Sequence, residues 1–166
     1  MKKVLCLLTL LLTAAACESD TTGTSGGGTG PSGGGSASMS ARIDGQTWTA
    51  ASSSIDGSNI SGVVTIIGAE AGGASSRTIT LTVVANTVGT YPIGAPPVIQ
   101  PATNAFLSAG AAQWAADTSR GSVSITLLSL NASGASGTFQ FTAAPIVGTT
   151  ASGDRVVTDG SFNVRF

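Results

Sequence analysis

Hydrophobic and polar residues alternate one by one along four segments of the chain. Residues 78–83, 122–127, 138–142 and 161–166 each place an apolar side chain at every second position, with polar residues between. A period of two puts the apolar side chains on one face of a β-strand and the polar ones on the other. These segments are therefore predicted to be strands with one buried face.

Shorter apolar runs that are bounded by turn residues predict further strands. They cover residues 39–43, 46–50, 60–68, 90–93, 104–107, 113–116 and 155–158. The Asp-Gly pairs at 44–45, 56–57 and 159–160 favour positive φ and predict tight turns. At residues 127–130 the apolar positions shift by one, which indicates a β-bulge or the end of a strand.

The domain shows no convincing helical pattern. The nearest candidate, residues 106–117, contains Gly110 and lacks a capping box, so we expect a hairpin there or at most one helical turn. Many short strands at this spacing are typical of antiparallel all-β folds. The sequence therefore predicts an antiparallel β-sandwich of about 8–10 short strands, with a β-barrel as the alternative.

The N-terminal residues follow a different pattern. Lys2 and Lys3 precede an apolar run over residues 4–12, and small residues follow at 13–16. This order is that of a secretory signal peptide. The apolar run is about half as long as the roughly 20 residues that span a bilayer, so residues 1–16 are predicted to be cleaved.

The next segment is rich in Gly, Ser and Thr. Residues 18–38 contain eight glycines and no apolar side chain larger than alanine or proline. Such a segment buries too little surface to offset its conformational entropy. We predict a flexible tether over residues 17–38, followed by one domain over residues 39–166 that is long enough for its own core.

The start of that tether resembles a lipidation site. Ala14-Ala15-Ala16-Cys17 resembles the lipobox of bacterial lipoproteins. The resemblance implies that Cys17 becomes the first residue of the mature chain and carries acyl groups such as palmitate. It also implies attachment to membrane lipid in the bacterial cell envelope, at the outer membrane, on its periplasmic or surface face. The alternative is ordinary cleavage near Ala16, which leaves Cys17 as a free thiol.

Charge and residue types exclude much chemistry. The protein has no histidine, and two of its seven Lys and Arg lie in the signal peptide, which leaves five Arg against eight Asp and Glu. No basic field exists to hold phosphates, so we expect no nucleic-acid partner. Schiff-base and histidine-dependent catalysis and histidine metal sites are excluded. The sequence implies no metal and no cofactor.

Six carboxylates of the domain still need an interpretation. They are Asp44, Asp56, Glu70, Asp117, Asp154 and Asp159. Two of them held about 5–10 Å apart would allow a carboxylate-dependent hydrolase. Three of the six lie in Asp-Gly pairs and Asp154 follows Gly153, which favours turns over catalysis. We therefore assign no catalytic residue and expect no enzyme.

The few aromatic residues are mostly needed for a core. The predicted core aromatics are Trp48, Tyr91, Phe139, Phe141, Phe162 and Phe166. Trp114 follows the small residues 108–112, and two interpretations stay open for it. It is either buried in the core or an exposed platform on which a sugar ligand stacks.

Short signatures also occur in order along the domain. They are DGQTW at 44–48, GTY at 89–91, GSVSI at 121–125, GTFQF at 137–141 and DGSFNV at 159–164. This order resembles a family of bacterial lipoprotein domains of unknown function, over nearly all of residues 39–166. The family supplies no catalytic residues, so the resemblance implies a β fold and an envelope location only.

Three functions follow as hypotheses. The first is a non-catalytic envelope or surface module that binds protein or glycan. The second is a purely structural envelope lipoprotein, and the third is a carboxylate-dependent hydrolase. The tether, the predicted β domain and the missing catalytic residue types favour the first.

Overall fold

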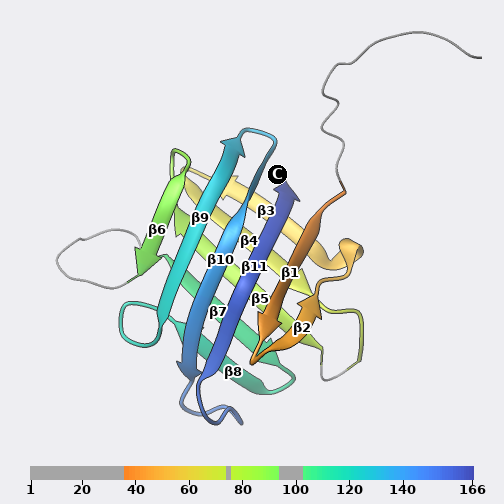
Figure 1. The fold of residues 1–166 in the computed structure, drawn as a ribbon, viewed down its shortest axis with the longest axis vertical. Coiled ribbons are helices and arrows are strands. Elements are labelled where there is room, and N and C mark those ends of the chain that lie inside the picture. Colours follow the sequence, from red (N-terminus) through yellow and green to blue (C-terminus); the bar gives the residue numbers. More distant parts are fainter. Residues whose placement is uncertain (1–35, 74–75, 94–102) are drawn as a thin grey trace, which may run out of the picture. The chain divides into compact units, whose positions relative to one another are not determined.

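A computed structural model describes residues 36–73, 76–93 and 103–166. This part of the chain contains eleven strands, one short 3-10 turn and no α-helix (Figure 1). In chain order the elements are β1 (Ser38–Ile43), β2 (Gln46–Thr49), η1 (Ser52–Ser54), β3 (Ile55–Ile60), β4 (Val63–Ala69), β5 (Arg77–Val84), β6 (Gly89–Ile93), β7 (Asn104–Ala109), β8 (Ala112–Ala116), β9 (Ser122–Asn131), β10 (Gly134–Pro145) and β11 (Arg155–Arg165). The predicted signal peptide, Cys17 and the tether up to residue 35 lie outside the described residues.

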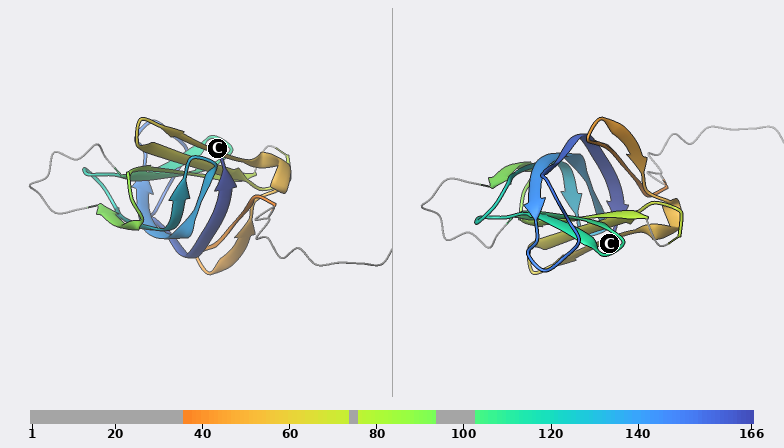
Figure 2. Two further views of the ribbon diagram at one scale, coloured as in Figure 1. Left: turned by 90° about the horizontal axis from the view of Figure 1, so that it is seen from above. Right: turned by 90° about the horizontal axis from the view of Figure 1, so that it is seen from below.

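The strands form one antiparallel sheet that curls into two layers (Figure 2). In the view of Figure 1 the front layer has the order β2-β1-β11-β10-β9-β6, and the back layer has the order β3-β4-β5-β7-β8. The layers join where the end of β10 pairs with β8, with Ala144 opposite Ala115. The predicted antiparallel all-β fold is confirmed, and because the sheet forms a half-barrel, both sandwich and barrel describe it.

Apolar side chains from both layers fill the space between them. The front layer supplies most of the aromatic part of the core, with Trp48, Phe139, Phe141 and Phe162. The back layer supplies Trp114 and an aliphatic part, with Val64, Ile66, Ile79, Leu81, Val83 and Leu107. Tyr91 and Phe166 are partly buried against this cluster. The predicted aromatic core is therefore confirmed.

The three Asp-Gly pairs have three different structures. Asp44 and Gly45 have φ values of 50° and 79° and form the predicted turn between β1 and β2. Asp159 also has a positive φ, of 52°, but lies within β11, where the pairing of β11 with its neighbours shifts register. This pair is a β-bulge, so the predicted strands at 155–158 and 161–166 form one strand, β11, which ends at Arg165.

The third pair, Asp56-Gly57, corrects the predicted turn. It lies inside β3, which pairs with β4 along its whole length. A Cβ at Gly57 would lie 2.9 Å from Cγ2 of Val164, so the glycine permits close approach of β3 to β11. The actual turn is Ser61-Gly62, with φ values of 53° and 84°, and it divides the predicted strand at 60–68.

Two further expectations are confirmed. Residues 106–117 form most of the β7–β8 hairpin and contain no helix. In the pairing of β9 with β10, Ser129 faces Ser136 and Leu127 faces Gly137. Leu128 between them is the extra residue of a β-bulge, which explains the shift of the apolar pattern at 127–130.

Candidate functional site

The outer face of the back layer exposes large apolar side chains. In the sheet register, Ile67 of β4 faces Thr80 of β5, which faces Phe106 of β7. Ile67 is 36% exposed and Phe106 40% exposed. The neighbouring rows of the same face add hydroxyl groups. We call this surface the back-face patch, and it consists of Ile67, Thr80 and Phe106 with Thr65, Thr78, Thr82 and Ser108.

Adjacent apolar residues in the strands explain why this patch exists. Ile66 and Ile67 are neighbours in β4, and successive side chains of a strand point to opposite faces. Ile66 is fully buried, so Ile67 faces outward. Phe106 and the buried Leu107 form the same kind of pair in β7. The patch was missed in the sequence, although these pairs were its signal.

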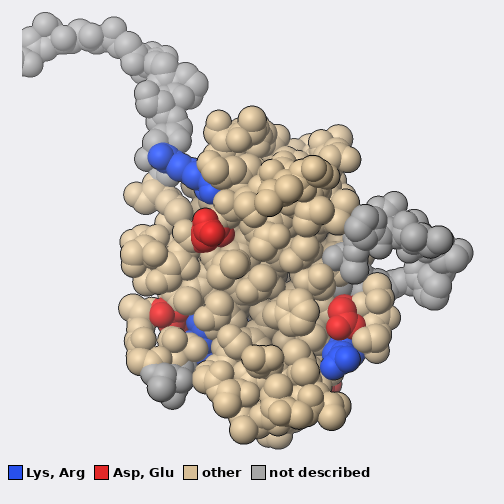
Figure 3. Space-filling view, turned by 180° about the vertical axis from the view of Figure 1, so that it is seen from behind, with Lys and Arg blue, Asp and Glu red and all other residues tan. Residues whose placement is uncertain are grey.

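The back-face patch is free of charge. Charged side chains lie only toward the margins of this face (Figure 3). Residues 57–69 and 78–116 contain no Asp, Glu, Lys, Arg or His, and Asp56 stands opposite Ile67 at the β3 margin. Such a surface offers apolar contact and hydroxyl hydrogen bonds. These are interactions that suit a protein or a glycan and do not attract phosphates.

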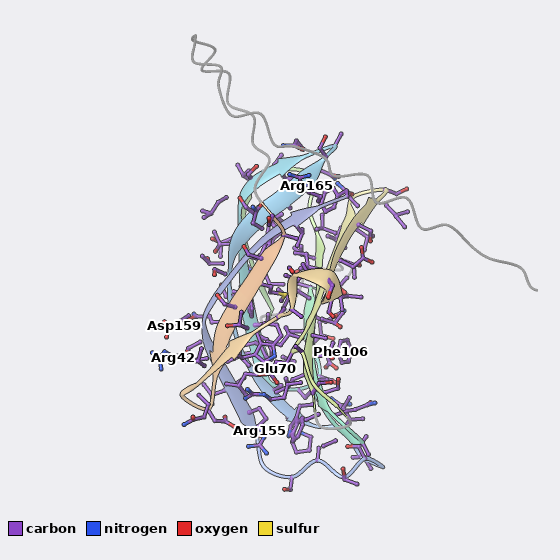
Figure 4. All side chains as sticks on the ribbon, turned by 90° about the vertical axis from the view of Figure 1, so that its right-hand side faces the viewer. Arg42, Glu70, Phe106, Arg155, Asp159 and Arg165 are labelled. Carbon is purple, nitrogen blue, oxygen red and sulfur yellow. The ribbon has the colours of Figure 1, made fainter. Side chains whose placement is uncertain are left out.

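The outer face of the front layer is different. One row of hydroxyl residues crosses it from β6 to β2, and it consists of Thr90, Thr126, Thr138, Ser161, Ser40 and Thr49. The hydroxyls of Thr90 and Thr126 lie 2.9 Å apart, and those of Ser40 and Ser161 3.2 Å apart. Seen edge-on, Arg42 and Asp159 lie on this side of the domain, and Phe106 lies on the other (Figure 4).

Four of the six domain carboxylates contact an arginine. The pairs and their N–O distances are Asp44–Arg155 at 2.8 Å, Glu70–Arg77 at 2.5 Å, Asp117–Arg120 at 3.6 Å and Asp159–Arg42 at 3.6 Å. Each of these acids has its own arginine. Residues 36–73, 76–93 and 103–166 bring together no group of three or more Asp, Glu, Cys or His side chains that would hold a metal ion.

These contacts lower carboxylate pKa values. The hydrogen bond from the Arg77 side chain is the main reason that the pKa of Glu70 lies below its ordinary value. Burial raises the pKa of Asp44, but hydrogen bonds from the Val156 amide and Arg155 outweigh it and leave the pKa lowered. A glycosidase general acid needs the opposite, a raised pKa. Neither carboxyl group therefore has the character of such an acid.

Trp114 is buried, which corrects its interpretation as an exposed platform. Its side chain is 4% exposed, and its Nε1 donates a hydrogen bond to the carbonyl of Gly153 at 2.8 Å. The guanidinium carbon of Arg155 lies 4.8 Å from the ring centroid. The ring thus packs on the core and under Arg155, a cation–π contact. No face of it is left for a sugar.

Comparison with known families assigns the domain to a family. The chain matches a domain family of unknown function, DUF6252, over residues 35–164. The chain belongs to this family. No curated protein and no solved structure matches it. The sequence predicted a domain family of unknown function over nearly all of residues 39–166, and this prediction is confirmed. Within the part of the chain that the structure describes, no helix has the length and apolar character to cross a membrane.

Proposed function

We propose that this protein is a lipid-anchored lipoprotein of the bacterial outer membrane whose DUF6252 domain is a non-catalytic binding module for protein or glycan. The anchor is Cys17, and the domain binds its ligand through the back-face patch. The single observation that carries the binding role is the exposed, uncharged row of Ile67, Thr80 and Phe106.

The anchor is supported by the order of the N-terminal segments. An apolar run, four small residues and Cys17 come before a Gly-rich segment that leads into β1. Stable membrane attachment takes two or more acyl chains, since each buried methylene contributes about 0.8 kcal/mol. A diacylglyceryl group on the Cys17 sulfur and an acyl group on its nitrogen meet this condition.

The binding role is supported by how the apolar residues are divided. The interior already has a complete aromatic and aliphatic core, yet Ile67 and Phe106 stay outside it. They lie on one row with Thr80 of β5 between them, hydroxyl residues occupy the rows on either side, and the one charged neighbour in the row is Asp56 at the β3 margin. Aromatic residues are enriched and charged residues depleted at the centres of binding surfaces, and this composition matches the patch.

Cell fractionation tests the anchor. Wild-type protein is expected in the membrane fraction, and the Cys17→Ser variant is expected in the soluble fraction, because it lacks the acylated sulfur. A Cys17→Ser variant that stays with the membrane would contradict lipid anchoring at this residue.

Variants of the patch test the binding role. Screens of glycan arrays and envelope proteins with the folded protein identify a ligand, and Phe106→Ser and Ile67→Ser are expected to weaken that binding. Val156→Ser is the matched control, because Val156 is a similarly exposed apolar residue on β11 of the front layer. Binding that resists both patch variants would contradict the proposed site, and an absence of any ligand would favour a purely structural role.

A further inference from the structure

A second set of exposed apolar residues lies at one end of the domain, apart from the row of Ile67 and Phe106. It consists of Ile60, Val63, Val88 and Leu128, and we call it the apolar end. Ile60 is 70% exposed and Leu128 66% exposed. Residues this large and this exposed are unusual as a group, because isolated surface apolar residues are the ordinary case.

Strand pairing and hydrogen bonds bring these residues to the same end. Ile60 faces Val63 across the Ser61-Gly62 turn. The carbonyl of Gly62 accepts a hydrogen bond from the amide of Ala85 at 2.8 Å, at the start of the loop that contains Val88. That loop continues into Gly89, which pairs with Leu127 beside Leu128.

The domain also begins at this end. Ser38, the first residue of β1, faces Asn163 of β11. Asn163 faces Ser136 of β10, and Ser136 faces Ser129 of β9. Ser129 follows Leu128 in the chain, so the start of β1 and Leu128 lie at the same level of the front layer. Figure 1 shows the start of β1, the end of β9 and the turn between β3 and β4 at one end of the domain. The predicted tether therefore enters the domain at the apolar end.

The segments that form the apolar end carry no charge. Residues 57–69, 78–116 and 121–153 contain no Asp, Glu, Lys, Arg or His, and Asp117 and Arg120 lie between the last two ranges. These segments therefore lose no charged side chain from water when this end moves into the interfacial region of a bilayer. Arg165, which faces Gly134 at the end of β11, also lies at this end (Figure 4), and its long side chain lets the guanidinium stay at the level of the headgroups. Charge desolvation is the main cost that opposes such a transfer.

We propose that the apolar end docks on the surface of the lipid bilayer to which the protein is anchored. The proposal rests on the lipid anchor at Cys17 proposed above. A flexible coil as long as the predicted tether at residues 17–38 has a root-mean-square span of roughly 25 Å, so the tether allows the apolar end to reach the bilayer. Tethering also raises the effective concentration of the domain at the membrane, so that weak insertion of a few apolar side chains suffices. Docking at this end leaves the back-face patch, Ile67 with Phe106, on the side of the domain.

The opposite end of the domain offers a matched control. Val147 lies in the connection between β10 and β11 and is 95% exposed, so it is at least as accessible as any residue of the apolar end. The same connection contains Asp154 and leads into Arg155. Exposure alone thus predicts lipid contact at Val147, whereas the docking proposal predicts none.

Tryptophan fluorescence on vesicles tests the proposal. The chain from Cys17 onward contains every described residue and a single thiol, so Cys17 is coupled to a maleimide phospholipid in phosphatidylcholine vesicles. The variants Ile60→Trp and Leu128→Trp are compared with Val147→Trp, after subtraction of the signal of the buried native Trp48 and Trp114. Each variant is first shown to unfold at the same denaturant concentration as the wild type. The two test positions lie in different layers, so if one variant does not fold, the other still tests the docking proposal.

The expected result is a blue shift and a loss of emission at positions 60 and 128 when the vesicles contain acyl-brominated lipid, with no change at position 147. Equal quenching at all three positions, or none at any, would overturn the docking proposal. A change that needs no lipid and grows with protein concentration would assign the apolar end to a second copy of the chain. Chemical coupling makes this result independent of cellular lipidation, which the Cys17→Ser fractionation tests separately.

Discussion

The two layers of the domain share one core but differ on their outer faces. The front layer presents a row of Ser and Thr, in which two pairs of hydroxyls hydrogen-bond to each other. The back layer presents Ile67 and Phe106, which are adjacent in sequence to the buried Ile66 and Leu107. The front face therefore pairs four of the six hydroxyls of its row with each other and exposes Val156 singly, whereas the back face places two large apolar side chains, Ile67 and Phe106, in one row. This difference is the reason to place binding on the back layer.

Substitution of Ile66 and Ile67 is expected to give the largest contrast between the inner and outer faces of the back layer. Ile66→Ala removes a fully buried side chain and is expected to lower the free energy of unfolding by about 2–5 kcal/mol. Ile67→Ala changes a partly exposed residue and is expected to lower it by about 1 kcal/mol or less. Urea unfolding of both variants measures the two values. An equal decrease in the free energy of unfolding of the two variants would show that Ile67 stabilises the fold, which would contradict its assignment to a binding surface.

An intermediate effect is expected at the charged margin of the back layer. The pKa of Glu70 is lower in the folded protein than its ordinary value, so its pair with Arg77 stabilises the fold above the unfolded pKa and loses that contribution as pH falls through the folded pKa. Glu70→Gln is expected to lower the free energy of unfolding by about 1 kcal/mol at pH 7. The gap between wild type and variant closes as the solution is acidified below pH 4.5, the ordinary pKa of a glutamate side chain. A gap that is the same at neutral and acid pH would contradict an ionic role of Glu70.

The smallest effect is expected on the outer face of the front layer. Thr126→Val removes one hydroxyl from the pair with Thr90 and keeps a β-branched side chain that suits a strand. We expect a change of about 0.5 kcal/mol or less in the free energy of unfolding, because the site is accessible to water. Thermal unfolding measures it, with Thr138→Val on the same row as the matched control. A large loss would show that the hydroxyl row holds the front layer together.

Most strands were predictable from the sequence because their faces differ in polarity. The alternation in β5 and at the centre of β10 is a direct consequence of one buried and one exposed face. β3 was missed because Asp56-Gly57 has the composition of a turn, and only the packing of Gly57 against Val164 explains a glycine there. The local sequence Asp56-Gly57 is compatible with both a turn and a strand, and the tertiary contact with Val164 selects the strand.

The candidate site was less predictable than the fold. The Ile66-Ile67 pair shows in sequence that one isoleucine faces outward, but the row with Thr80 and Phe106 needs the register of three strands. Trp114 could not be placed from its small neighbours at 108–112. Its burial depends on Gly153 and Arg155, which approach it only in the folded domain.

The intact mass of the mature protein, purified from bacterial membranes, tests the central claim most directly. Lipid anchoring predicts a chain that begins at Cys17 and exceeds its polypeptide mass by a diacylglyceryl group and an acyl group. It also predicts no reaction with amine reagents, because the mature chain contains no lysine and its N-terminus is acylated. A chain of unmodified polypeptide mass with a free Cys17 thiol would contradict the account.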